Sequence, residues 1–287
     1  MSALFLSKRL LNLIIVLCLV TPALVSYWRG TWHILDLFVF PNDTFLSAWL
    51  TFIVSFELIY SVMLAEDHLK AFLEERRAKK LFHITLFSLL GFVIVNTWRG
   101  LWMLLDYYTT TSLISGCVSH AVGFFMVLST KTTSSITAAP SWCMREKNDR
   151  KLESILYRKL WLNTGTTSRA TDIAGRIVNS FFTVFVTGAG VISYWRGTWV
   201  IMDALTMPQE SDKLKSSIVS ICTGYSVFVV CYIISEFVLT ANNLTQPFSL
   251  RCRALEQVYV YILGFGTVNC WRGIWYIEDV YLLPGEV

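Results

Sequence analysis

The sequence predicts an all-α protein, a polytopic bundle of membrane helices, and three observations lead to this fold class. Of its 287 residues, 54% are hydrophobic and only 15% are charged, whereas soluble domains carry about 25% charged residues. Apolar segments that are too long for the strands of a soluble core recur along the chain. A Trp-Arg-Gly-x-Trp-x-x-x-Asp pattern occurs in four copies, which indicates a repeated structural unit.

Seven segments have the length and composition of membrane-crossing helices, which need about 20 mainly apolar residues. They are residues 10–27, 45–64, 81–98, 112–130, 177–195, 216–239 and 256–271. Lys8 and Arg9 precede the first segment, as in a signal peptide. Its apolar stretch continues through Ser26, however, and no small-residue cleavage site follows a short core. We therefore interpret it as an uncleaved first span.

Basic residues are concentrated in alternate connections, and this asymmetry predicts the orientation. They occur before the first span, in residues 66–80, in residues 131–176, and at Arg251 and Arg253. The positive-inside rule places these connections and the N-terminus in the cytoplasm. Asn42 begins an Asn-Asp-Thr sequon in the first connection on the opposite side, where it is a possible glycosylation site.

The repeated motif is the most specific feature of the sequence. Its four copies comprise Trp28, Arg29, Gly30, Trp32 and Asp36; Trp98, Arg99, Gly100, Trp102 and Asp106; Trp195, Arg196, Gly197, Trp199 and Asp203; and Trp271, Arg272, Gly273, Trp275 and Asp279. Copies one and three share the longer sequence Ser-Tyr-Trp-Arg-Gly-Thr-Trp, and copies two and four both carry Asn two residues before the first Trp. The chain therefore divides into two related halves of two units each.

Three regions follow from this division. Residues 1–130 form a first membrane half with units one and two, residues 131–176 a basic cytoplasmic connection, and residues 177–287 a second membrane half. Because each half contains an even number of spans, the halves are expected to be parallel repeats. Only eight residues follow Asp279, so the fourth unit lacks a returning span. Either the molecule has seven spans, or this is a shortened form of an eight-span chain.

The spacing within one motif limits what its charges can do. On a helix, the two Trp residues lie four apart and share a face. The Arg and the Asp lie seven apart, about 10 Å along the axis, which is too far for a comfortable pair within one copy. Pairing between copies, or stacking of Arg on a neighbouring Trp, is more plausible. Gly permits close backbone approach or a helix break, so we expect the motif where an outgoing span ends and a shallow Trp-lined segment begins.

Two interpretations of the motif remain open. In the first, Trp anchors the membrane interface while Arg and Asp join adjacent units; four Arg and four Asp balance, as such a network requires. In the second, the four motifs converge and line a polar path, because intramembrane charges often mark ion or solute pathways.

The remaining polar residues of the spans give weaker signals. Glu57 and Glu236 are single carboxylates in apolar surroundings, each expected to face the protein interior, water or a helix end. His120 is interpreted as a hydrogen-bonded core residue. The cysteines show no metal-type spacing, and no catalytic, nucleotide-binding or cofactor motif is present. The sequence thus predicts neither an enzyme nor a metal or cofactor site, and its small positive charge is not gathered into a nucleic-acid-binding stripe.

The repeated Ser-Tyr-Trp-Arg-Gly-Thr-Trp and Asn-x-Trp-Arg-Gly-x-Trp sequences resemble the fuseless family, multi-pass membrane proteins of invertebrates described as eight-pass. The resemblance extends from the first span to Asp279. It implies a plasma-membrane protein of the presynaptic terminal that organises or regulates calcium channels and transmitter release. The implied partners are the lipid bilayer and other membrane proteins, such as voltage-gated calcium channels or active-zone proteins. It implies no catalytic residues.

Two other functions are compatible with parts of the sequence. A transporter or channel is favoured by the half-repeats and by a possible ring of charged motifs. A seven-helix receptor of the G-protein-coupled kind would need an extracellular N-terminus, against the basic residues around the first two spans.

Overall fold

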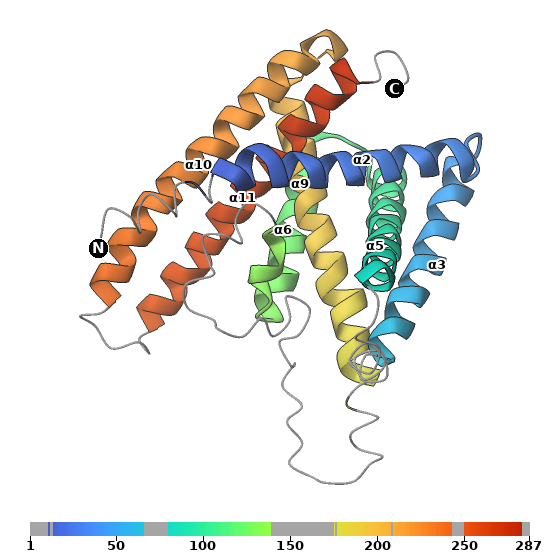
Figure 1. Cartoon of the computed structure of the whole chain (residues 1–287), viewed down its shortest axis with the longest axis horizontal. Coiled ribbons are helices and arrows are strands. Elements are labelled where there is room, and N and C mark those ends of the chain that lie inside the picture. Colours follow the sequence, from blue (N-terminus) through green and yellow to red (C-terminus); the bar gives the residue numbers. More distant parts are fainter. Residues whose placement is uncertain are drawn as a thin grey trace.

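The structure, a computed structural model, describes residues 11, 14–65, 80–138, 175, 177–207, 209–242 and 250–282, and all regular structure in these ranges is helical. The α-helices are α2 (Thr21–Phe38), α3 (Thr44–Leu64), α5 (Lys80–Thr109), α6 (Leu113–Ser129), α9 (Ala189–Thr206), α10 (Lys213–Asn242) and α11 (Leu250–Tyr281) (Figure 1). The π-helical turns η1 (Val16–Val20) and η3 (Phe182–Gly188) lead into α2 and α9. The turns η2 (Thr133–Ile136) and η4 (Glu210–Asp212) are 3₁₀-helical.

The all-α prediction is therefore confirmed for the described residues, and the membrane prediction is supported by helix length and composition. Four described helices are long and apolar enough to cross a membrane: Thr44–Leu64, Ile84–Thr109, Ile177–Thr206 and Lys213–Ile234. A fifth, Leu113–Ser129, is apolar but shorter. Glu236 lies on α10, but its side chain is outside the described residues.

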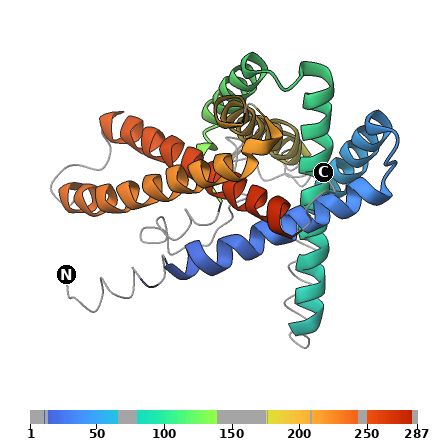
Figure 2. The same cartoon turned by 90° about the horizontal axis from the view of Figure 1, so that it is seen from above.

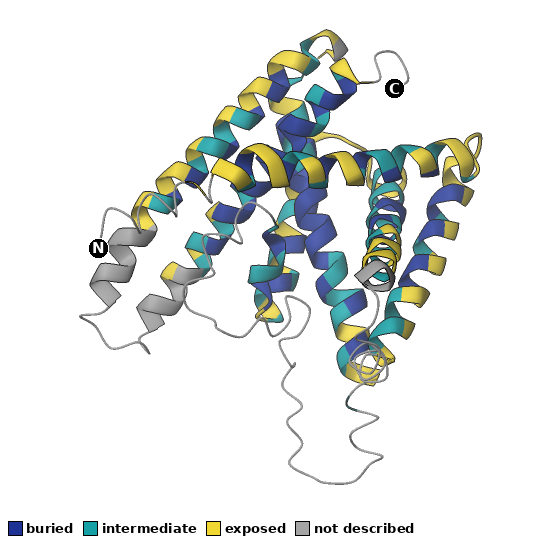
Figure 3. Ribbon diagram, viewed as in Figure 1, coloured by how far each residue is buried: buried dark blue, intermediate teal, exposed yellow. Residues whose placement is uncertain are grey.

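Exposed residues recur along the outer surface of these helices (Figure 3), and many of them are large and apolar. Ile114 and Phe125 on α6 are 76% and 66% exposed, and Phe38 at the end of α2 is 79% exposed. Soluble monomers rarely expose extended apolar surface of this kind. A bilayer would cover it without cost, since lipid tails are as apolar as these side chains.

Three antiparallel helix pairs form most of the molecule. Helix α3 packs along α5, α6 along α9, and α10 along α11. Figures 1 and 2 show α10 and α11 running side by side for most of their length. Helix α2 contacts both α5 and α11, but no described helix runs lengthwise beside it in either view.

Glycine permits these pairs to approach closely. A Cβ added to Gly123 of α6 would lie 2.5 Å from the carbonyl oxygen of Gly190 and 2.9 Å from the carbonyl carbon of Ser193. A Cβ on Gly224 of α10 would lie 2.8 Å from the backbone nitrogen of Cys270 on α11. Membrane helices commonly use small residues in this way, because backbone contact replaces the hydrophobic driving force that lipid removes.

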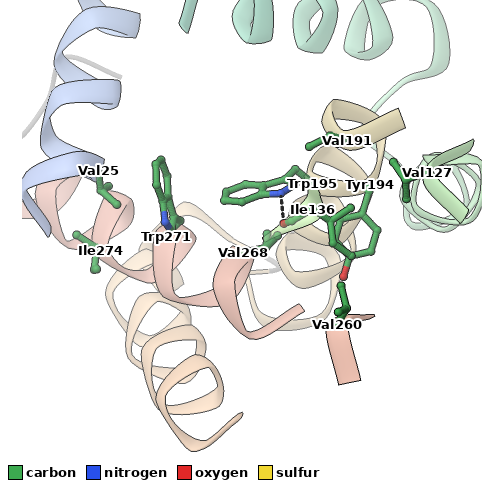
Figure 4. Packing of buried hydrophobic residues seen from close by; sticks show 10 residues of the cluster. All are labelled: Val25, Val127, Ile136, Val191, Tyr194, Trp195, Val260, Val268, Trp271 and Ile274. Carbon is green, nitrogen blue, oxygen red and sulfur yellow. Dashed lines mark hydrogen bonds between the residues drawn. The ribbon is translucent and has the colours of Figure 1, made fainter. Parts of the chain in front are cut away.

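The core lies where the helices meet, and Trp195 and Trp271 are at its centre (Figure 4). Trp195 is 5% exposed and Trp271 is 6% exposed. The indole N–H of Trp195 donates a 2.9 Å hydrogen bond to the carbonyl oxygen of Ile136. A buried indole N–H needs such a partner, so the short η2 segment is held against the centre of the bundle. Ile136 belongs to the region predicted as the cytoplasmic connection; residues 139–174 of that region lie outside the described residues.

The motif was expected where an outgoing span ends and a separate Trp-lined segment begins, but the structure shows no break between two segments at any copy. The expected spans ended at residues 27, 98, 195 and 271, but α2, α5, α9 and α11 continue through every copy, and Asp36, Asp106, Asp203 and Asp279 all lie within them. The motif glycines do not break the helices. At three of them the missing Cβ instead admits the backbone of a neighbouring helix, as described below. The helices that contain the motif, α2, α5, α9 and α11, are called the motif helices hereafter.

Candidate functional site

The four motifs meet, and their charged residues form a closed ring of ion pairs between different motif helices. Each Arg pairs with the Asp of the preceding copy, and the first Arg pairs with the last Asp. The pairs are Arg29 Nε–Asp279 Oδ1 at 2.6 Å, Arg99 Nη2–Asp36 Oδ1 at 2.7 Å, Arg196 Nε–Asp106 Oδ1 at 2.8 Å, and Arg272 Nη2–Asp203 Oδ1 at 2.7 Å. Both charges of every copy thus link that copy to its two neighbours.

Burial of the guanidinium groups makes these pairs structurally important. Arg196 and Arg272 are fully buried, Arg99 is 1% exposed and Arg29 is 7% exposed. The Asp side chains are more accessible, from 6% exposed at Asp279 to 44% at Asp36. A buried charge that loses its partner costs about 3–5 kcal/mol. The ring therefore stabilises the assembled helices mainly because separating them would leave the buried Arg side chains without their charged partners.

The motif tryptophans form two further closed rings, one for each Trp position. The first ring joins Trp28, Trp98, Trp195 and Trp271, with successive centroids 5.1, 5.2, 5.3 and 5.5 Å apart. The second joins Trp32, Trp102, Trp199 and Trp275, at 6.0, 5.7, 5.8 and 5.9 Å. All eight contacts are edge-to-face, and such contacts contribute about 0.5–1.5 kcal/mol each beyond burial.

The register of the two rings fixes the relative direction of the motif helices. The first Trp of each motif contacts only first Trp residues of other motifs, and the second contacts only second ones. Because these residues are one helical turn apart, all four helices pass the common centre in the same direction. Their N-terminal ends therefore lie on one side of the rings.

A cavity of about 390 Å³ lies at this centre. All eight motif tryptophans line it, together with Ser135, Thr137, Ala138, Met207, Lys213, Tyr276 and Asp279. Asp279 is the one charged motif residue of its lining, and it also pairs with Arg29 in the ion-pair ring. The lining is mainly indole rather than a succession of charges.

The helices that pack on the motif helices contribute a second repeat, which the sequence analysis missed. Arg99 Nη2 donates to Ser47 Oγ of α3 at 2.9 Å, and Arg196 Nη1 donates to Ser115 Oγ of α6 at 3.0 Å. Arg272 Nη2 donates to Ser216 Oγ of α10 at 2.6 Å. Each hydroxyl satisfies part of a buried guanidinium, which has five N–H donors.

These serines begin the same pattern, Ser-small-x-x-Ser/Thr-x-x-x-small, at residues 47–55, 115–123 and 216–224. The sixth position of the pattern lies opposite a motif glycine. A Cβ on Gly100 would clash with the backbone of Phe52, one on Gly197 with the backbone of His120, and one on Gly273 would lie 2.9 Å from the backbone nitrogen of Ile221. We call this the serine pattern, and α3, α6 and α10 the serine helices. Because small residues are common in apolar helices, the serine pattern can be recognised only once its contacts with the motif Arg and Gly are known.

Other sequence-predicted residues lie away from the ring. Glu57 is exposed on the outer surface of α3, and Asn42 is exposed in the turn between α2 and α3. His120 is a satisfied core residue, with Nδ1 2.9 Å from Thr198 Oγ1 and Nε2 2.9 Å from Tyr261 Oη. The described residues contain no group of three or more His, Cys, Asp or Glu that could hold a metal ion.

The structure adds residues to the site that no motif indicated. Lys213 Nζ lies 3.4 Å from Asp279 Oδ2, and Tyr276 Oη donates to Asp203 Oδ1 at 2.7 Å. Glu278, next to Asp279, is 7% exposed and accepts a 2.5 Å hydrogen bond from Ser26 Oγ. These contacts join α2, α9 and α10 to the C-terminal part of α11.

The fold and the site define an all-α protein of the membrane type whose motif helices are joined around one tryptophan-lined centre. The chain belongs to the Fuseless family, which matches residues 7–287. The resemblance predicted from the repeated motif is therefore confirmed over nearly the whole chain. No curated protein and no solved structure gives a significant match to the sequence.

We predict that replacing Arg196 with Met destabilises the protein by about 1–3 kcal/mol, because the partly exposed Asp106 loses its ion pair and Ser115 loses its hydrogen-bond donor. Chemical or thermal unfolding of the purified protein in mild detergent measures this. Lys131→Met, a matched loss of charge at the end of α6, serves as the control and should have less than about 1 kcal/mol of effect. Equal stability of the Arg196→Met variant and the control would contradict a structural role for the ring.

Proposed function

We propose that this chain is a non-enzymatic membrane protein that organises or regulates presynaptic calcium channels, and thereby transmitter release, through contacts with other membrane proteins. The presynaptic role follows from what the family implies. The structural observation that best supports it is the closed Arg–Asp ring. Motif charges that could have served a reaction or a transport path are instead used to join helices. The exposed apolar surfaces of α3, α6 and α10 remain available for other membrane proteins.

We also propose that the chain crosses the membrane seven times, as two parallel halves with the N-terminus in the cytoplasm. The common direction of the four motif helices supports this, because each would cross from the same side. In the sequence, the basic stretches 66–80 and 131–176 precede the second and third motif helices, so the positive-inside rule favours entry of these helices from the cytoplasm.

Cysteine accessibility at the two ends of α3 tests this topology. Asn42 and Ala65 are both exposed and flank the helix. With a membrane-impermeant thiol reagent on intact cells, we expect Asn42→Cys to be labelled above the unsubstituted chain, and Ala65→Cys only after permeabilisation. The reverse result would place the N-terminus outside and favour the receptor topology.

Affinity purification of the tagged chain from neural tissue in mild detergent tests the organising function. We expect a calcium channel or an active-zone protein to be recovered at an amount close to that of the chain. Untagged tissue treated identically is the control. Recovery of the chain without a membrane-protein partner would contradict the proposal.

A second candidate function, binding or passage of a small solute, is favoured by one observation, the cavity of about 390 Å³ inside the tryptophan rings. All four Asp residues belong to the ion-pair ring, but only Asp279 among them also lines this cavity, so the two functions predict different behaviour for its replacement. The aspartates can therefore be compared by replacing each with Asn.

For an organising protein we expect all four Asp→Asn variants to reach the cell surface in reduced amounts and none to change solute or ion flux. The reason is that each leaves a buried Arg without its charged partner. Surface biotinylation and flux measurements on the same cells give both quantities. A change of flux or selectivity in Asp279→Asn alone, at normal surface expression, would instead establish a path through the tryptophan rings.

A further inference from the structure

The two tryptophan rings enclose the central cavity rather than fill it. In the first ring, successive indoles stand at 85–90° to one another, and Figure 4 shows Trp195 and Trp271 in this arrangement. The centre of a four-membered ring with sides of 5.1–5.5 Å lies about 4 Å from each ring centroid, so indoles that pointed edgewise at the centre would occupy it. A cavity of about 390 Å³ is present instead. The indoles therefore line it with their faces.

Aromatic faces attract positive charge. The face of an indole carries negative potential, and a cation is held by it when it lies within about 6 Å of the ring centroid. A cation at the centre of either ring would lie within this distance of all four of its indoles. The second ring lies one helical turn further along the motif helices, so the cavity offers two such positions in succession.

The same site already places cations over an aromatic ring. Tyr276 lines the cavity, and the guanidinium carbon of Arg272 lies 4.7 Å from the centroid of its ring. Lys213 Nζ lies 5.4 Å from the same centroid. Both cations belong to the protein. They show that the aromatic surface at this end of the cavity is compatible with positive charge.

The lining offers little to an anion. The indole N–H of Trp195 donates to the carbonyl oxygen of Ile136, and that of Trp199 donates to Tyr276 Oη at 2.9 Å. These two donors are therefore engaged within the protein. Among the described lining residues, Lys213 carries the one positive charge, and it lies 3.4 Å from the carboxylate of Asp279. The two charges offset each other, which leaves the indole faces to select the ligand.

The lining also does not suit a metal ion. Hard cations replace their bound water with several protein oxygen atoms, and the tryptophan rings contribute none. The described residues contain no group of three or more His, Cys, Asp or Glu that could do so. A quaternary ammonium group has no N–H to hydrate, and its methyl groups are apolar, so indole faces can surround it at little cost in hydration.

We propose that the tryptophan rings bind an organic cation of the quaternary ammonium class. The inference goes beyond the organising role, and it rests on the second candidate function, for which it names the class of ligand. The volume of the cavity is within the range of about 300–1,000 Å³ that small-molecule sites occupy.

The first test compares two compounds of the same shape. Choline is the cationic probe, and 3,3-dimethylbutan-1-ol is its uncharged counterpart, with carbon in place of the ammonium nitrogen. Binding to the purified full-length chain in lipid nanodiscs is measured by isothermal titration calorimetry. We expect saturable binding of choline, roughly tenfold or more tighter than that of the alcohol. Comparable binding of the two compounds would show a merely apolar site, and either that result or no saturable choline binding would overturn the proposal.

The second test locates the bound cation. Trp32→Leu removes one wall of the second ring, and Trp49→Leu on α3 is the matched control. Both indoles are half-buried, and each makes two edge-to-face contacts, but Trp49 does not line the cavity. We expect choline binding to weaken roughly fivefold or more in Trp32→Leu and to be unchanged in Trp49→Leu. Equal affinities of the two variants would place the cation elsewhere and contradict the proposal.

If Trp32→Leu does not elute from a sizing column like the unsubstituted chain, fluorinated tryptophans at position 32 replace it. Fluorine withdraws electrons from the ring face and changes its shape little, so choline binding should weaken with each added fluorine. Affinity independent of fluorination would overturn the proposal.

The third test asks which charge the ligand carries where it meets the protein. Lys213→Met removes the positive charge of the lining, while Asp279 keeps its ion pair with Arg29. This variant should bind choline at least as tightly as the unsubstituted chain, because a nearby like charge is removed. Weaker binding would overturn a site selective for cations. These measurements use the isolated chain and record neither partners nor flux, so a negative result would strike the cation site and leave the organising role standing.

Discussion

The arrangement of the molecule depends on the pairing of buried guanidinium groups with carboxylates from a neighbouring repeat. A fully buried Arg such as Arg196 or Arg272 is tolerated only where its charge and its N–H donors are satisfied. The motif cannot do this alone, because its own Asp is about two helical turns away. Each Arg therefore pairs with the Asp of the preceding copy. The Arg of the first copy pairs with the Asp of the fourth, and this last pair closes the ring. The tryptophan rings then line the cavity at the common centre of the motif helices.

In copies two to four, the glycine of the motif lets a second helix approach closely enough for its Ser to accept a hydrogen bond from the buried Arg. Where the backbone of a serine helix reaches the glycine, its first Ser lies five residues earlier and accepts from the guanidinium. The structural unit is thus a motif helix with the serine helix that packs on it, rather than an outgoing span with a returning one. Three such units, together with α2, account for the α-helices of the described residues.

The sequence predicted this arrangement only in part, for identifiable physical reasons. Helical spacing alone showed that Trp28 and Trp32 share a face and that Arg29 cannot comfortably reach Asp36. Helical spacing could not show which Asp pairs with each Arg, because every other copy of the motif contains an Asp at the same position. The glycines were predicted to be possible helix breaks, since glycine serves both breaks and close packing, and only the tertiary contacts at Gly100 and Gly197 distinguish the two. The serine pattern was missed because small residues in an apolar segment do not stand out in composition.

The central claim is that residues at opposite ends of the chain close one ring, and the pair Arg29–Asp279 tests it most directly, because 250 positions separate the two residues. The measurement is a double-mutant cycle of unfolding free energies with Arg29→Met, Asp279→Leu and the double variant in mild detergent. A closed ring predicts that the double variant loses less stability than the sum of the two single variants, with a coupling of about 1–3 kcal/mol. Additive effects, with no coupling between the two positions, would contradict the ring.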